Sequence, residues 1–214
     1  MCGDPEFTDG VKLMSKQTIW NYLKTHTDLP DVSIAGIMGN MEAESNCEAC
    51  RVQGDFSPDR SRSKDYANSV NNGSKTVYTF MHDALGWGLC QWTYFSRKEN
   101  LYKACKSYGV GIENEKAQLA FMLSEMQNEF STMWRSLLSC TDIYTAAYLV
   151  CHNYECPAVE NTQVRANLGQ QIYNQFHGQD ITPEPEPDPD PKPVDDETDK
   201  IIALLEQIIA LLKS

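Results

Sequence analysis

Two glutamates, Glu42 and Glu44, lie close together in the stretch AGIMGNMEAESN, residues 35–46. The apolar residues before them recur at helical spacing, which predicts a buried helix over residues 32–47. The negative end of a helix dipole disfavours an ionised carboxylate, so Glu44, in the expected last turn, is the better candidate for a carboxyl that keeps its proton. Such a group can act as the general acid that cleaves a glycosidic bond. The ordinary alternative is that both glutamates are solvated carboxylates at a helix end.

The stretch GWGLCQWT, residues 86–93, brings two tryptophans and a glutamine together with glycines. The flat apolar faces of Trp87 and Trp92, with the amide of Gln91 near them, suit the binding of a sugar ring. Both rings could equally belong to a hydrophobic core, and the sequence leaves this choice open.

The elements that must position these residues are mostly helical. Apolar residues at helical spacing predict further helices over residues 16–25, 96–108, 113–129, 132–139, 142–153 and 161–177. Residues 48–85 are instead rich in Asn, Ser, Gly and Asp, and the run VNNGSKTVYTF predicts a turn followed by a β-type segment. The predicted fold is therefore α+β, a mainly helical domain with a small β-lobe, and the glutamates lie where the two parts meet.

Three blocks of this sequence resemble the phage tail lysozyme family. They read IAGIMGNMEAESN, DALGWGLCQWTYFSRKENLY and NYECPAVENTQVRANLGQQIYNQF, at residues 34–46, 83–102 and 153–176. The patterns GNxxxES and GxGLxQWTxxxRK in this order are specific, and YExP…R in the third block supports them. The resemblance covers about residues 15–178.

The resemblance implies a lysozyme-like fold and hydrolysis of peptidoglycan. It places the catalytic acid at the glutamate of the ES pair, which is Glu44 in this sequence. It also implies that Gly88, Gln91 and Trp92 shape the sugar cleft, to which the pattern of residue types adds Trp87. It assigns no role to Glu42, which is expected to be a solvated or supporting carboxylate.

The second catalytic carboxylate is less well defined. Candidates in or next to the expected β-lobe are Asp55, Asp59, Asp65 and Asp83. Asp83 is preferred because it resembles an acidic position that recurs beside the GLxQWT block of the family. If no second carboxylate reaches the cleft, a hydroxyl of the substrate could attack instead, and the enzyme would be a lytic transglycosylase using Glu44 alone. Glu155 could approach the cleft, although a structural role is the preferred interpretation, and His82 is interpreted as a bystander.

The charge of the chain is concentrated near its end. The formal net charge is −12, and residues 182–200 carry −6 of it. The remaining body is only mildly acidic, which argues against nucleic acid or an anionic membrane surface as a partner. No apolar stretch approaches the length of a membrane span.

The cysteines allow more than one interpretation. Cys47 and Cys50 form a CxxC, and Cys151 and Cys156 lie in CHNYEC. These four thiols could bind zinc, form disulfides or remain reduced, and the sequence does not decide among these states. The sequence contains no HExxH and no Cys/His pair in a clear motif, which argues against peptidase chemistry. Neither a metal nor a cofactor is predicted.

The composition divides the chain into four parts. Residues 1–14 are interpreted as cloning-derived residues and a leader, 15–178 as the catalytic domain, and 179–198 as an extended linker of alternating proline and acidic residues. Residues 199–214 read DKIIALLEQIIALLKS, a coiled-coil-like helix whose two possible heptad phasings favour a dimer or a trimer to tetramer. A homo-oligomer through this segment is predicted, and docking onto the chain's own domain is the alternative.

Together these observations predict an N-acetylmuramidase of a phage lysin, with bacterial peptidoglycan as its partner. The expected site is Glu44 and Asp83 for catalysis and Trp87, Gly88, Gln91 and Trp92 for substrate binding. The protein is expected to be made in the cytoplasm of the bacterial host and to act outside the cell on the wall. The alternatives are a lytic transglycosylase and a cell-wall-binding module without turnover.

Overall fold

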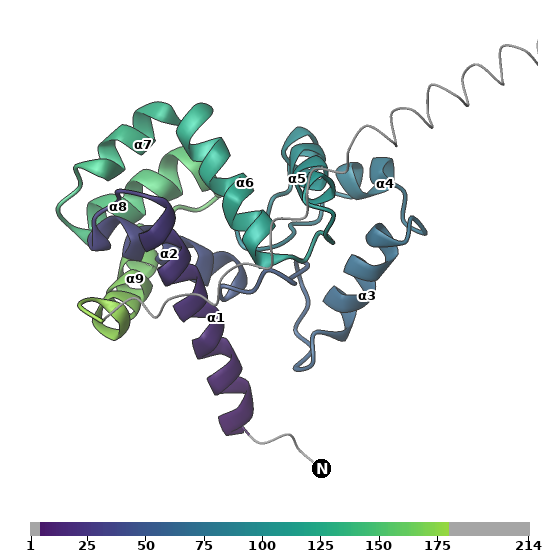
Figure 1. Cartoon of the computed structure of the whole chain (residues 1–214), viewed down its shortest axis with the longest axis horizontal. Coiled ribbons are helices and arrows are strands. Elements are labelled where there is room, and N and C mark those ends of the chain that lie inside the picture. Colours follow the sequence, from purple (N-terminus) through teal and green to yellow (C-terminus); the bar gives the residue numbers. More distant parts are fainter. Residues whose placement is uncertain (1–4, 180–214) are drawn as a thin grey trace, which may run out of the picture.

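The computed structural model describes residues 5–179, and nearly all of its regular structure is helical (Figure 1). The helices, in chain order, are α1 Pro5–His26, α2 Asp31–Ser45, α3 Ser61–Asn71, α4 Val77–His82, α5 Phe95–Ser107, α6 Glu115–Asn128, α7 Ser131–Leu138, α8 Ile143–Val150, the π-helix Cys151–Glu155 and α9 Thr162–Phe176. The linker and the C-terminal helix predicted from the sequence lie outside the described residues, apart from residue 179. Within the described range, no helix is long and apolar enough to span a membrane.

Helix α2 is the centre of the larger part of the domain, and it packs closely against α8 and α9. It is buried on almost every side, because residues 33–41 are all inaccessible to solvent. Small residues allow this approach: a Cβ added to Gly36 would come within 2.5 Å of the Ala146 side chain, and one added to Gly169 would come within 2.6 Å of the Ala35 carbonyl oxygen. The position of the last turn of α2, which carries Glu44, is therefore determined by two neighbouring helices.

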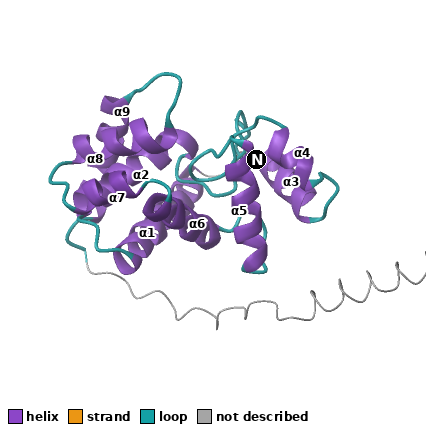
Figure 2. Ribbon diagram, turned by 90° about the horizontal axis from the view of Figure 1, so that it is seen from above, coloured by secondary structure: helices purple, strands orange, loops and turns teal. Residues whose placement is uncertain are grey.

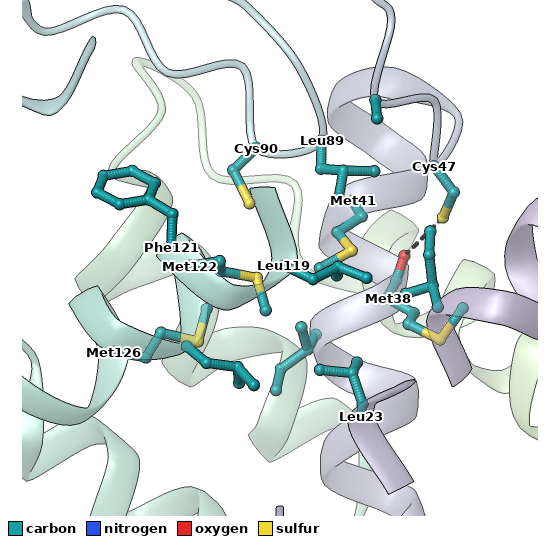
Figure 3. Close-up of a cluster of buried hydrophobic side chains, with 14 of the residues drawn as sticks. Leu23, Met38, Met41, Cys47, Leu89, Cys90, Leu119, Phe121, Met122 and Met126 are labelled. Carbon is teal, nitrogen blue, oxygen red and sulfur yellow. Dashed lines mark hydrogen bonds between the residues drawn. The ribbon is translucent and has the colours of Figure 1, made fainter. Parts of the chain in front are cut away.

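A cluster of buried apolar side chains joins α2 to other segments (Figure 3). Met38 and Met41 from α2 lie among Leu23 of α1, Leu119 of α6 and Leu89 of the loop that precedes α5. Burial of these side chains, at about 1.5–3 kcal/mol each, holds that loop against the end of α2. The core thus brings together two of the sequence blocks that are expected to form the site.

The small β-lobe expected at residues 48–85 is not confirmed, because these residues form helices α3 and α4. In Figures 1 and 2 the two helices lie together at the side of the molecule away from α7, α8 and α9. Helix α3 buries Ser63, Tyr66, Ala67 and Val70 at helical spacing, a stripe hidden in a polar sequence. The backbone between residues 48 and 93 contributes only isolated bridges, from Val52 to Trp87 and from Trp87 to Trp92.

The β-type run after residue 76 is helical for a local reason. The side chain of Thr76 accepts a hydrogen bond from the backbone amide of Thr79, which caps the start of α4. Phe80, one turn further on, is fully buried and anchors the helix. The aromatic and β-branched residues that suggested a strand therefore belong to a capped helical turn.

The other predicted helices are confirmed with small differences at most of their ends, except that the first begins earlier and the helix predicted over 142–153 continues as a π-helix after Val150. Helix α2 stops at Ser45 because Asn46 and Cys47 adopt left-handed backbone conformations, with φ angles of 58° and 57°. Helix α1 begins at Pro5, inside the segment that was expected to precede the domain.

Candidate active site

A cleft of about 650 Å³ opens at the end of α2, within the size range of ligand-binding pockets. Its walls come from four separate segments, within residues 43–44, 51–56, 90–93 and 155–158. Two carboxyl groups, those of Glu44 and Glu155, are among the lining residues. The fold thus brings two acidic residues that are distant in the sequence to one concave surface.

Glu44 is held by an arginine on a neighbouring helix. The Arg165 Nη2 donates to Glu44 Oε1 at 2.6 Å, and Arg165 itself is 6% exposed. The other terminal nitrogen, Nη1, donates to the Asn40 side-chain oxygen at 3.0 Å. Asn40 in turn donates to the carbonyl oxygens of Gly36 and Ala147. The Asn and Glu of the GNxxxES pattern are therefore parts of one buried hydrogen-bond chain that orients Glu44.

The serine of the same pattern connects α2 to the opposite wall. Ser45 Oγ donates to the Leu89 carbonyl oxygen at 2.9 Å. Two residues later, the side-chain nitrogen Nε2 of Gln91 donates to the carbonyl oxygens of Gly88 and Arg51, at 2.9 and 3.2 Å. Gln91 therefore braces two loops and also lines the cleft.

Glu155 is the last residue of the π-helix that follows α8. The Cys156 amide donates to the Cys151 carbonyl oxygen at 2.9 Å, and Cys156 then leaves the helix with a φ angle of 45°. Such π-turns are frequent at functional sites. Burial, followed by the negative charge of Glu44, raises the pKa of Glu155 to about 8. The raised pKa favours the protonated form of the Glu155 carboxyl group at neutral pH.

A buried ion pair behind the cleft supports the π-helix. Arg97 donates to both carboxylate oxygens of Glu125 at 2.9 Å, and Glu125 is 2% exposed. The Tyr154 hydroxyl and the Trp92 indole nitrogen donate to Glu125 Oε2 at 2.6 and 3.0 Å. Because Tyr154 directly precedes Glu155, this cluster restricts where Glu155 can lie.

The predicted aromatic binding residues are in the core. Trp87 and Trp92 are 0% and 1% exposed, and neither lines the cleft. The Trp87 indole nitrogen donates to the Ile112 carbonyl oxygen at 3.0 Å. Gly88 has a φ angle of 74°, and a Cβ there would overlap the side chain of Gln118. These three residues build the loop that carries Gln91, so of the predicted binding residues only Gln91 is in the wall.

Asp83, the predicted second carboxylate, does not line the cleft. Its Oδ1 accepts from Lys98 Nζ at 2.7 Å, and its Oδ2 accepts from the Tyr66 hydroxyl at 2.7 Å and from Lys75 Nζ at 3.2 Å. Burial opposes ionisation, but the hydrogen bonds from Lys98 and Tyr66 outweigh it and lower the pKa of Asp83. Asp83 is an ionised anchor between α3, α4 and α5.

The remaining acidic candidates also lie elsewhere. Asp55, Asp59 and Asp65 are not in the lining of the cleft, and both carboxylate oxygens of Asp55 accept hydrogen bonds from Ser57 or Ser63. Glu42 pairs with Lys16 at 2.9 Å, and its side chain is 11% exposed, so it is more buried than expected.

No cysteine within residues 5–179 is part of a disulfide. Cys47, Cys50, Cys151 and Cys156 are all free thiols. In the described part of the chain, no three His, Cys, Asp or Glu side chains are grouped as metal ligands. Cys90 and Cys156 line the cleft, but they belong to different walls.

The sequence suggested a structural role for Glu155, although this residue is the glutamate of the YExP pattern in the third block. Its importance depends on burial and on the charge of Glu44, which only the fold provides. Phe56, another residue of the cleft, is 87% exposed and was not singled out by any motif.

Comparison with known families finds a match over most of the chain. The sequence model of the phage tail lysozyme family matches residues 15–176, from α1 to the end of α9. A comparison with curated protein sequences finds no match.

Proposed function

The chain belongs to the phage tail lysozyme family, a family of lysozyme-type enzymes that cleave peptidoglycan, and we propose that it is an N-acetylmuramidase. The bond cleaved would join N-acetylmuramic acid to N-acetylglucosamine in the glycan strand. The observation that carries this proposal is that Glu44 and Glu155 line the same cleft. Glycoside hydrolysis generally needs two carboxyl groups on opposite sides of the bond, one protonated and one ionised.

The two glutamates have different surroundings. The guanidinium of Arg165 contacts Glu44, whereas burial and the charge of Glu44 keep the proton on Glu155. A carboxyl group with a raised pKa, close to a second carboxyl group that pairs with a cation, is a typical arrangement of an acid and a base. Because the two groups interact, the proton belongs to the pair as a whole. The proposal therefore gives the acid proton to the Glu44–Glu155 pair rather than to Glu44 alone.

A second carboxyl in the cleft favours hydrolysis over the transglycosylase alternative. A lytic transglycosylase needs only one glutamate, because a hydroxyl of the substrate attacks the sugar. With Glu44 and Glu155 in one cleft, one carboxyl can donate the proton while the other stabilises the oxocarbenium-like sugar or activates water. We therefore propose that Glu155, and not Asp83, is the second carboxyl group of the catalytic pair.

The substrate surface of the proposal is polar, with one exposed ring. Gln91, Arg51 and Gln53 supply hydrogen-bonding groups, and Phe56 supplies an apolar face. Trp87, Gly88 and Trp92 then contribute indirectly, by holding the loop of Gln91. Peptidoglycan is the substrate, and we propose that the protein is made in the host cytoplasm and acts on the wall from outside the cell.

The proposal is tested by digestion of purified sacculi with the Glu44→Gln and Glu155→Gln proteins. Both variants should release far fewer reducing ends than the wild type. Glu129→Gln, at an exposed position beyond α6, is the matched control and should keep full activity. Undiminished release by Glu44→Gln would contradict the proposal.

Mass spectrometry of the wild-type products separates the alternatives. Products with a normal reducing end support a hydrolase, and 1,6-anhydro products indicate a transglycosylase. Sedimentation with sacculi without any released product would instead indicate a wall-binding module.

A further inference from the structure

A row of exposed aromatic rings lies outside the cleft, on α4 and the start of α5. It consists of Tyr78, His82, Phe95 and Tyr94, called the aromatic row below. Ring centroids are 4.3 Å apart from Tyr78 to His82, 5.6 Å from His82 to Phe95 and 4.8 Å from Phe95 to Tyr94. Tyr78 is 71% exposed, Tyr94 63% and Phe95 43%. Contiguous rings exposed in this way are typical of binding surfaces.

The aromatic row borders a hollow of about 350 Å³ that adjoins the cleft. The hollow is lined by Met81, His82, Ala84, Thr93, Tyr94 and Phe95. Thr93 lines both the hollow and the cleft of Glu44 and Glu155. A polymer that fills the cleft can therefore continue past Thr93 into the hollow.

A buried ion pair holds the two helices of the row together. Asp83 follows α4 directly, and Lys98 in the first turn of α5 donates to it at 2.7 Å. Lys98 is 0% exposed and also donates to the Leu85 carbonyl oxygen at 2.9 Å. The backbone segments that carry the rings are thus fixed relative to each other, so little conformational freedom is lost when a ligand binds.

The chemistry of the hollow suits a neutral sugar better than a charged peptide. None of its six lining residues is Lys, Arg, Asp or Glu. Ring faces, Met81 and Ala84 can contact the apolar faces of sugars and the methyl groups of N-acetyl substituents. His82 Nδ1 lies 2.9 Å from the Tyr78 carbonyl oxygen and donates to it, which leaves Nε2 as an acceptor for a sugar hydroxyl.

We propose that the aromatic row and its hollow form a remote subsite for the glycan strand of peptidoglycan. The subsite binds acetylated amino sugars of the strand beyond those that the cleft itself holds. This inference rests on the proposed function, because the cleft supplies the continuity. It predicts that long strands bind more tightly than short ones, and that the difference depends on the rings.

The test measures binding by the Glu44→Gln protein, so that the ligand is not consumed. The probes are long glycan strands stripped of stem peptides, an oligosaccharide of about four sugars, and soluble stem peptides. Tyr94→Ala and Tyr78→Ala are each added to this background. Tyr144→Ala is the matched control, since Tyr144 is 51% exposed on α8 and lines neither the cleft nor the hollow.

Each ring variant should weaken binding of long strands about fivefold, the effect of losing part of one ring contact. Binding of the short oligosaccharide, and binding by the Tyr144→Ala protein, should not change. Equal affinity of the ring variants and their parent for long strands would overturn the proposal. Ring-dependent binding of stem peptides in place of stripped strands would also overturn it and assign the row to the peptide.

Turnover of sacculi by the wild-type chain, measured separately, distinguishes this proposal from the proposed function. Cleavage of sacculi without any effect of the ring variants on binding means that the subsite is wrong and the enzyme assignment stands. Ring-dependent binding of long strands without cleavage means that the subsite is right and the enzyme assignment fails.

Discussion

Arg165 Nη2 lies 2.6 Å from Glu44 Oε1, and this ion pair joins α9 to the last turn of α2. The guanidinium is nearly buried, at 7% side-chain exposure, while the Glu44 side chain is 22% exposed on the cleft. Arg165 reaches Glu44 only because α2 and α9 pack closely. The other terminal nitrogen of Arg165, Nη1, donates to the Asn40 side-chain oxygen. The orientation of Glu44 and its contact with a cation therefore depend on helix packing as much as on the GNxxxES pattern.

Replacing this arginine should reduce both stability and activity. Arg165→Ala leaves Glu44 and Asn40 without their shared donor, and we expect a loss of about 2–3 kcal/mol in the free energy of unfolding, because one partner of a largely buried ion pair is removed. Arg165→Lys keeps the charge but cannot reach both acceptors with a planar fork, so its stability and activity should be intermediate. Chemical denaturation and digestion of sacculi measure the two effects.

The control for this prediction is Arg135→Ala, which removes an exposed arginine of α7. Its unfolding midpoint and activity should match the wild type. If Arg165→Ala were as active and stable as Arg135→Ala, the ion pair would have no role in positioning Glu44.

The raised pKa of Glu155 makes stability depend on pH. The pKa is about 8 in the folded protein and near 4.5 in the unfolded chain. Between these values the unfolded state has lost the proton that the folded state keeps, so the contribution of Glu155 to stability falls as pH rises. Glu155→Gln, which is always neutral, should lose less stability than the wild type between about pH 5 and about pH 8. Denaturation curves at several pH values check this.

The hydrolysis rate should also depend on the protonation of Glu155. The wild-type rate on sacculi should fall above about pH 8, where Glu155 loses its proton and the cleft no longer holds an acid. A rate that stays constant well above that pH would show that Glu155 does not carry the catalytic proton.

The Asp83→Asn variant distinguishes a catalytic role of Asp83 from a role in the stability of the fold. The substitution leaves the buried ammonium of Lys98 without its ionised partner, and we expect a loss of about 3 kcal/mol in the free energy of unfolding. The folded fraction should keep its turnover on sacculi, since Asp83 does not line the cleft. The double variant Asp83→Asn/Lys98→Met should recover part of the stability. A folded Asp83→Asn protein without activity would instead restore Asp83 as the second catalytic carboxylate.

The sequence predicts most helices because their apolar stripes are strong. Helices α2, α5, α6 and α9 carry repeated aliphatic or aromatic residues at helical spacing, and their bounds agree with prediction to within a few residues. Helix α3 escapes detection because its buried stripe includes Ser63 and Ala67 and its exposed residues are strongly polar. Short elements of this kind are stabilised by tertiary packing more than by their own pattern.

The site is predictable only where one local pattern contains it. Glu44 and Gln91 are in short blocks with distinctive residues, and both line the cleft. Trp87 and Trp92 have the residue type of a sugar-binding surface, but burial decides their role, and burial is a property of the fold. Glu155 lies in the cleft although its residue type and local pattern did not single it out, because its raised pKa arises from burial and from the charge of a residue far away in the sequence.

Gly88→Ala tests the loop that carries Gln91. Gly88 has a φ angle of 74°, and a Cβ there would overlap Gln118, a buried side chain that bonds the Leu89 amide. We expect a loss of about 2 kcal/mol or more, from backbone strain and overlap together, and reduced activity. Gly109→Ala is the matched control, with a φ angle of 68° and no atom within 4 Å of the added Cβ. It should lose only about 1 kcal/mol, the cost of the left-handed backbone alone.

Removal of residues 180–214 tests the predicted oligomer. The sequence of residues 199–214, outside the described part of the chain, carries two overlapping heptad stripes, so the full chain should be a homo-oligomer by light scattering and the shortened chain a monomer. Each catalytic domain should hydrolyse soluble glycan strands at the same rate in both proteins, because the cleft lies within residues 43–158. On intact sacculi, the oligomer should be the more effective enzyme at low concentration, since several linked domains bind one polymer with higher avidity. An oligomer that survives the deletion would locate the interface within the catalytic domain instead.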